Sequence, residues 1–114
     1  LNRCLAIERP SVFQFLNTHV VILIEKALKK HPNITKLFCH QGSALVVSRI
    51  TSLFSRPGLN IASNITNRGN SVSATLPILV EDAQEESPLT SDDLILLVGF
   101  GVGLQAHLVV FRPL

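Results

Sequence analysis

The feature that most limits the fold of this chain is a regular alternation between helical and strand-like apolar patterns. Apolar residues that recur at steps of three and four predict amphipathic helices, and short apolar runs between turn residues predict strands. The helices are expected at residues 11–30, 43–54 and from Ser71 or Ser73 to about Glu86. The strands are expected at residues 36–39, 60–65, 94–100 and 104–111.

This order predicts an α/β fold with a mixed sheet, in which the last two strands form an antiparallel pair. Residues 1–10 read as an irregular lead-in, and residues 1–114 as a single domain fragment. The third helix has small and apolar residues on all sides between residues 72 and 80, which predicts a buried helix.

Composition indicates a piece of a larger assembly. Charged residues make up 16% of the chain, against about 25% in typical domains, and there is no methionine. We therefore expect an excised or processed chain whose apolar faces meet absent polypeptide. The net charge of +2 argues against a nucleic-acid partner, and the apolar runs are too short to span a membrane. Two distant cysteines form neither a disulfide framework nor a metal pattern, which favours a cytoplasmic protein.

Four features are candidates for chemistry. His40 follows the strand at 36–39, and ligands of α/β sheets bind at the carboxyl ends of strands. Cys39 is its neighbour, but adjacent strand residues point to opposite faces, so Cys39 is expected in the core. Asn70, in a polar loop, reads as a turn or cap residue or as a functional one. The glycines of residues 99–103 suit either a hairpin turn or backbone N–H groups aimed at an oxyanion.

Three segments together resemble the C-terminal part of 3-oxoacyl-acyl-carrier-protein synthase III, in the thiolase superfamily. They are FCHQ at 38–41, NRGNSVSA at 67–74 and LILLVGFGVGL at 94–104. They occur in the family's order, and the thirty residues from His40 to Asn70 match the spacing of its catalytic His and Asn. The resemblance extends from about residue 11 to the end of the chain.

The resemblance implies a decarboxylative condensation of an acyl thioester with malonyl-ACP. His40 and Asn70 would bind the malonyl-thioester carbonyl and stabilise the enolate, and a backbone N–H near Val102 would serve the oxyanion of the acyl-enzyme. It also implies weaker substrate or carrier contacts, at Gln41, Ser43 and Arg49. The family often has an arginine that is linked to carrier binding where this chain has Leu45, and Arg49 lies one turn further along the same helix.

The partners implied are acyl-CoA or acyl-ACP, malonyl-ACP, the acyl carrier protein itself and the N-terminal half of the enzyme, in a full-length homodimer. No cofactor and no metal are expected. In the family the nucleophilic cysteine lies in that N-terminal half, and neither Cys4 nor Cys39 matches its place, so this chain alone is expected to be inactive. The first strand of the family's C-terminal half, central in its sheet, is also absent. We expect the strands near Leu37 and Ile95 to close this gap by direct pairing, or self-association to cover it.

Two other functions stay open. A non-catalytic partner or regulatory subunit of a synthase would need neither His40 nor Asn70, so their presence counts against it. An acyltransferase of the same fold would pass the acyl group to an alcohol or amine, with His40 as general base.

Overall fold

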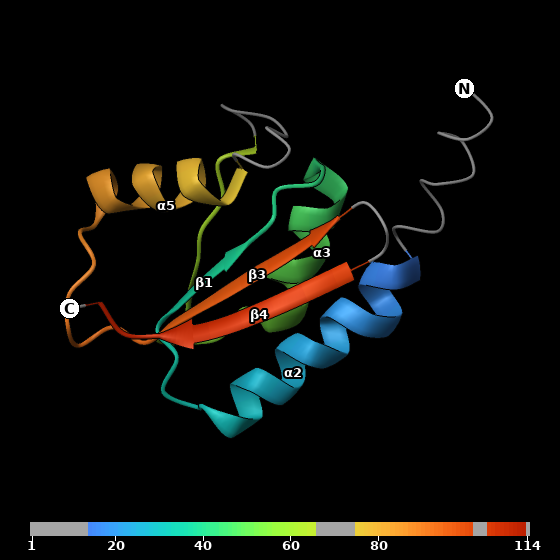
Figure 1. Ribbon diagram of the computed structural model, residues 1–114, viewed down its shortest axis with the longest axis horizontal. Helices are drawn as coiled ribbons and strands as arrows, with labels where there is room; N and C mark the ends of the chain where they lie inside the picture. The colour runs from blue at the N-terminus through green and yellow to red at the C-terminus, as the bar shows by residue number, and fades with distance from the viewer. Residues whose placement is uncertain (1–13, 66–74, 102–104, 114) are drawn as a thin grey trace.

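The computed structural model describes residues 14–65, 75–101 and 105–113 (Figure 1). Within these residues, four strands form one sheet in the order β2-β1-β3-β4. The strands are β1 (Lys36–Cys39), β2 (Asn60–Ile61), β3 (Ile95–Gly101) and β4 (Gln105–Phe111). The helices are η1 (Leu16–Val20), α2 (Val21–Lys30), α3 (Ala44–Phe54) and α5 (Thr75–Glu86).

The sheet is mixed, as expected. β1 runs parallel to both β2 and β3, while β4 returns antiparallel to β3, with Leu97 opposite Val109. The α/β class and the antiparallel last pair are therefore confirmed. β1 and β3 pair directly along the whole length of β1, from Lys36 opposite Ile95 onward. The expectation that these two strands close the gap by direct pairing is also confirmed.

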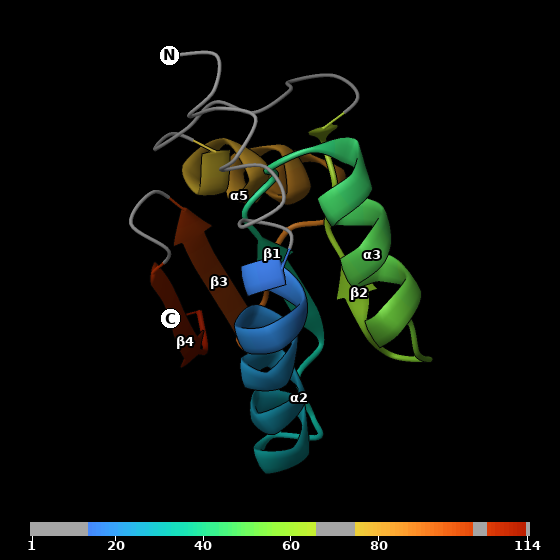
Figure 2. The same ribbon diagram turned by 90° about the vertical axis from the view of Figure 1, so that its right-hand side faces the viewer.

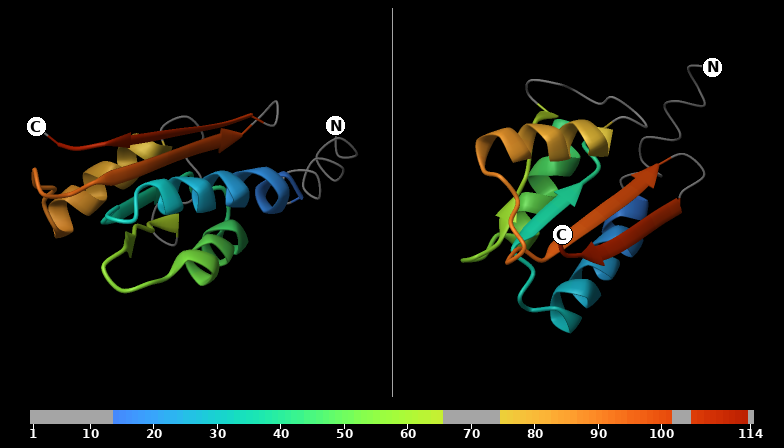
Figure 3. Two further views of the ribbon diagram at one scale, coloured as in Figure 1. Left: turned by 90° about the horizontal axis from the view of Figure 1, so that it is seen from below. Right: turned by 60° about the vertical axis from the view of Figure 1, so that its left-hand side comes forward.

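Alternation along the central strands builds one apolar layer on each face of the sheet. Leu37 and Leu96 belong to the core shared with α2 and α3, which lie side by side (Figure 2). Phe38 and Ile95 point the other way and pack against Leu79 of α5. In the right-hand view of Figure 3, α5 and α2 accordingly lie on opposite sides of the strands. None of the helices in the described residues is long and apolar enough to cross a bilayer.

Two details differ from the sequence expectations. The strand expected at 60–65 ends at Ile61, and further on the amide of Asn64 bonds to the side chain of Gln41 instead of a neighbouring strand. The helix expected at 11–30 contains the π-helical turn η1 near the start of its described part. The hydroxyl of Thr18, in that turn, donates to the carbonyl of Gln14, which precedes it, at 2.8 Å.

The expected full burial of the third helix is wrong for this chain. Leu79 of α5 is buried, but Leu76, Ile78 and Val80 are half-buried and Pro77 is exposed. Leu79 packs against Phe38 and Ile95 of the sheet, whereas Pro77 of the same helix is exposed among the described residues. The apolar outer side of α5 is consistent with the expectation that some faces meet other polypeptide.

Candidate functional site

His40 occupies the position where β1 ends. Its backbone N–H donates to the carbonyl of Val98 on β3, at 2.9 Å, so the strand pairing continues to this residue. Its ring meets Phe100 edge-on, with 5.3 Å between ring centroids and an 83° interplanar angle. On another side the ring lies close to Gly42, where an added Cβ would be 3.6 Å from Cδ2 of His40. The imidazole is thus positioned by β3 and by the start of the following loop.

The surroundings of His40 favour its neutral form. The imidazole is half-buried, and desolvation lowers its pKa below the usual 6.5. A neutral imidazole offers one N–H donor and one acceptor nitrogen. No hydrogen bond joins either ring nitrogen of His40 to another of the described residues. The ring can therefore donate to, or accept from, a molecule that approaches the end of β1.

Gln41, which was expected to contact substrate or carrier, lies in the interior of the structure. It is only 1% exposed, and both ends of its amide are used inside the chain. Nε2 donates to the carbonyl of Cys39 at 2.8 Å, and Oε1 accepts from the N–H of Asn64 at 3.2 Å. The side chain thus joins the end of β1 to the segment after β2.

Cys39 lies in the core, as predicted. It is 4% exposed, and burial raises the pKa of its thiol from 9.0 to about 12. A thiol with such a pKa is protonated at neutral pH, whereas the thiolate is the nucleophile. Cys39 is therefore unsuited to covalent catalysis, although it adjoins His40.

α3 presents Ser43 and Arg49 on the outside of the molecule. Ser43 caps the helix, because its Oγ accepts from the N–H of Val46 at 3.2 Å. Leu45 in the first turn is 65% exposed, which is high for a leucine. Arg49 follows one turn later and donates from Nε to Oδ1 of Asn17, at 3.0 Å. These contacts place a fixed cation and an exposed apolar side chain on the same outer surface.

Two other expected site residues, Asn70 and Val102, lie outside the described residues. The structure therefore shows His40 and Gln41 at one strand end and Ser43 at the start of the next helix, with Arg49 further along that helix. No group of three metal-binding side chains occurs in the part of the chain that is described.

The sequence reasoning missed a second polar connection near this strand end. Asn64 is buried, and its Nδ2 donates to Oδ2 of Asp82 on α5, at 2.9 Å. Together with Gln41 it links β1, the segment after β2, and α5. One signal was available, because Asn64 is a polar residue inside the strand expected at 60–65. Asp82 could not be found this way, since it sits among exposed acids.

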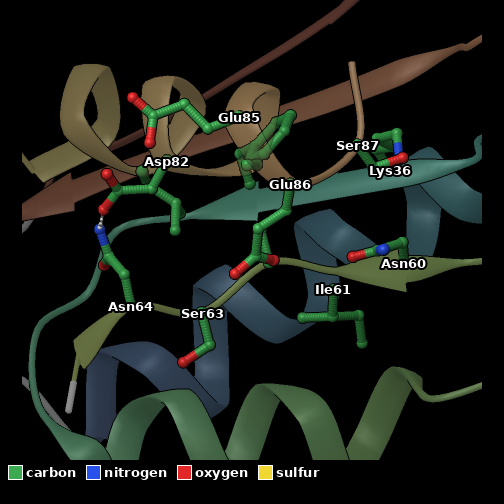
Figure 4. Close-up of a pocket in the computed structure, with 13 residues that line it drawn as sticks. Lys36, Asn60, Ile61, Ser63, Asn64, Asp82, Glu85, Glu86 and Ser87 are labelled. Carbon is green, nitrogen blue, oxygen red and sulfur yellow. Dashed lines mark hydrogen bonds between the residues drawn. The ribbon is translucent and has the colours of Figure 1, made fainter. Parts of the chain in front are cut away.

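A cleft of about 630 Å³ lies between α5 and the strands β1 and β2 (Figure 4). Its lining includes the carboxylates of Asp82, Glu85 and Glu86 and the amine of Lys36, but not His40. Asn64 points toward Asp82 at one end. The excess of carboxylates disfavours an anionic ligand there. This cleft is therefore separate from the strand end that carries His40.

Comparisons with known proteins agree with this fold. Residues 24–112 match the family model described as 3-oxoacyl-[acyl-carrier-protein (ACP)] synthase III C terminal. The beta-ketoacyl-[acyl-carrier-protein] synthase III of Prochlorococcus marinus (strain NATL2A) is 32% identical over 108 residues, which are 91% of this chain and 32% of that protein. The enzyme of the same name from Trichodesmium erythraeum (strain IMS101) is 30% identical over 112 residues, 95% of this chain and 34% of the relative.

A solved structure shows the shared fold. The crystal structure of 3-oxoacyl-(acyl carrier protein) synthase III from Pseudomonas aeruginosa PAO1 superimposes with a TM-score of 0.67 at 24% identity, over 78% of this chain and 29% of that one. The chain thus spans about a third of the length of the relatives that it matches. Since the family match extends over most of its residues, this chain belongs to the family of 3-oxoacyl-[acyl-carrier-protein] synthase III C-terminal domains.

Proposed function

We propose that this chain forms the C-terminal part of a condensing active site, in which an acyl thioester is joined to malonyl-ACP with loss of CO₂. The observation that carries the proposal is the neutral, positioned imidazole of His40 at the end of β1. Membership of the synthase III family supports the reaction class. Fatty acid synthesis is the setting that this family membership suggests.

His40 acts as a hydrogen-bond donor to the thioester carbonyl of the malonyl group, and Asn70 acts as the second donor. When the bond to the malonyl carboxylate breaks, CO₂ leaves and the electron pair stays on the α-carbon, delocalised onto the thioester oxygen. A neutral imidazole is a far weaker acid than an imidazolium, so it stabilises this enolate oxygen without protonating it. The enolate carbon stays nucleophilic and attacks the acyl carbonyl.

The acyl group is carried by a cysteine outside these 114 residues. Cys39 is too deeply buried and too weakly acidic for that role. The enolate attack breaks the C–S bond of the acyl-enzyme, and the cysteine leaves as a thiolate. The relatives are about three times as long as this chain, which leaves ample polypeptide for the nucleophile. The chain alone is inactive in this proposal, and a backbone N–H near Val102 completes the site for the acyl oxyanion.

The outer surface of α3 is the proposed contact for the carrier. Arg49 provides a fixed guanidinium there, and guanidinium groups bind phosphate well. Both CoA and the prosthetic arm of a carrier protein contain phosphate. Leu45 adds an exposed apolar contact on the same helix. Ser43, whose hydroxyl already caps α3, contributes to the shape of this surface.

The test measures two partial reactions of the assembled enzyme that contains this chain. His40→Ala is expected to lower CO₂ release from malonyl-ACP by about 10²- to 10³-fold, the usual effect of removing one oxyanion donor. Acylation of the nucleophilic cysteine should change far less. His19→Gln, at an exposed histidine on η1, is the matched control and should change neither rate. Equal CO₂ release from the His40→Ala and control variants would refute the proposal and favour a regulatory subunit.

A second function is favoured by the same lowered pKa, because a neutral imidazole can also accept a proton. In that case His40 would be the general base that activates an alcohol or amine for acyl transfer. The two functions differ in one product, because only the condensing reaction releases CO₂ from malonyl-ACP. Acyl transfer to an alcohol or amine without CO₂ release would select the second.

A further inference from the structure

The two edges of the sheet differ sharply. On one side the sheet ends in β2, which has only two residues, Asn60–Ile61. On the other side it ends in β4, which has seven residues, Gln105–Phe111. Among the residues that the structure describes, no strand pairs with the outer side of β4. In an antiparallel ladder, every second residue of an edge strand directs its N–H and C=O outward.

The edge of β4 lacks the usual devices that prevent pairing. Natural edge strands are blunted by lysine or other charges, by proline, or by being very short. β4 has the sequence QAHLVVF, which contains no Asp, Glu, Lys, Arg or Pro. Two of its apolar side chains are exposed, Val109 at 52% and Phe111 at 37%. β4 contains two valines and a phenylalanine, residue types that are enriched in strands, so its edge favours the addition of another strand.

The side-chain pattern of β4 indicates which strand fits. Ala106, Leu108 and Val110 are half-buried and pack on the core under α2, whereas the alternate residues are exposed. A two-fold axis at Leu108 pairs residues of the same parity, for example His107 with Val109 of a second copy. The half-buried residues of both copies then share one face of the sheet, and the exposed residues share the other. The absence of charge means that two copies do not repel one another along this edge.

We propose that β4 is a self-association edge, at which two copies of this chain pair their β4 strands antiparallel about Leu108 and form one continuous sheet. The surface differs from the strand end that carries His40 and from the outer surface of α3. The inference therefore does not depend on the proposed condensing reaction.

The first experiment measures the mass of the 114-residue chain in solution by sedimentation over a range of micromolar concentrations. The wild-type chain should reach twice the 12.5 kDa of one chain. In a dimer of Val109→Lys chains, each copy brings one positive charge to the shared edge. This should raise the dissociation constant of the dimer at least about tenfold. Ile22→Lys is the matched control, because Ile22 is similarly exposed, at 45%, but lies on α2. It should dimerise like the wild type, with circular dichroism confirming that both variants fold.

The second experiment tests the register, in a chain in which Cys4 is replaced by serine. A mixture of His107→Cys and Val109→Cys chains should form a mixed disulfide rapidly, because these positions face one another across the proposed axis. The control mixture of His107→Cys and Ile22→Cys should not. A monomeric wild type, a Val109→Lys variant that dimerises unchanged, or equal cross-linking in the two mixtures would each overturn the proposal.

Discussion

Replacing Gln41 with alanine is expected to destabilise the chain by about 2 to 4 kcal/mol. The change removes two hydrogen bonds, to the carbonyl of Cys39 and from the N–H of Asn64, each with a net value of about 1 kcal/mol. The groups left behind are buried, and an unsatisfied buried polar group costs about 1 to 3 kcal/mol. The space left by the side chain allows a water to recover part of this loss. The expected total is a large share of a small domain's stability, about 5 to 15 kcal/mol.

Urea unfolding of the wild-type and variant chains measures this difference directly. Gln84→Ala is the matched control, because Gln84 also accepts a backbone N–H, from Leu89 at 3.2 Å, but on the exposed surface. Its cost should stay below about 1 kcal/mol. If the Gln41→Ala variant were no less stable than the Gln84→Ala variant, the role of Gln41 as a buried connection between β1 and the segment after β2 would be wrong.

A Gln41→Glu variant sharpens the same test through its pH dependence. An ionised carboxylate can still accept from Asn64 but cannot donate to the carbonyl of Cys39, and it is a buried charge. The pKa of this glutamate should therefore be raised above the unfolded value of about 4.3. The loss of folding stability that ionisation of this glutamate causes should be absent below the unfolded pKa. It should grow as pH rises toward the folded pKa and be complete above the folded pKa. A penalty independent of pH would contradict this reasoning.

Two further predictions concern His40 and Ser43. Because desolvation lowers the folded pKa of His40 below 6.5, stability should be complete above pH 6.5 and fall as pH drops toward the folded pKa. Urea unfolding across this window should show that His40→Gln removes part of the slope, and an unchanged slope would refute the assignment. Ser43→Ala should cost about 1 kcal/mol through loss of the cap of α3, and Ser43→Asp much less. Equal losses in the two variants would exclude capping.

The parts of the fold that the sequence predicted are those with a strong local period. β1 and α3 begin and end within about one residue of the expected ranges. Pro32 follows the end of α2, before β1, and Arg56-Pro57-Gly58 follows the end of α3, so both helices have a clear stop signal in the sequence. Gly58 has a positive φ of 84°, a conformation that glycine adopts without strain. These signals are local, so they can be recognised in the sequence without knowledge of the tertiary structure.

The parts that could not be predicted depend on contacts distant in sequence. The interior place of Gln41 depends on Asn64, 23 residues later, and the place of Asn64 depends on Asp82. No periodicity records such pairs. The burial of α5 was overestimated, because the small and apolar residues at its start predict contacts on all sides. The described residues do not supply a layer that covers its outer side. Position alone did place His40 at a strand end, whereas its role rests on the family resemblance.

The direct pairing of β1 with β3 also affects the order in which the chain can fold during synthesis. Thr35, just before β1, bonds to Asp93 and Leu94, which are 58 and 59 residues later. At about 5 to 20 residues per second, a ribosome needs about 3 to 12 s to make that interval. β3 and β4, by contrast, are adjacent and can form a hairpin as soon as both emerge. β1 can meet β2 earlier, but its pairing with β3 must wait for seconds during translation, and chaperones have that interval in which to bind the β1 edge that β3 later covers.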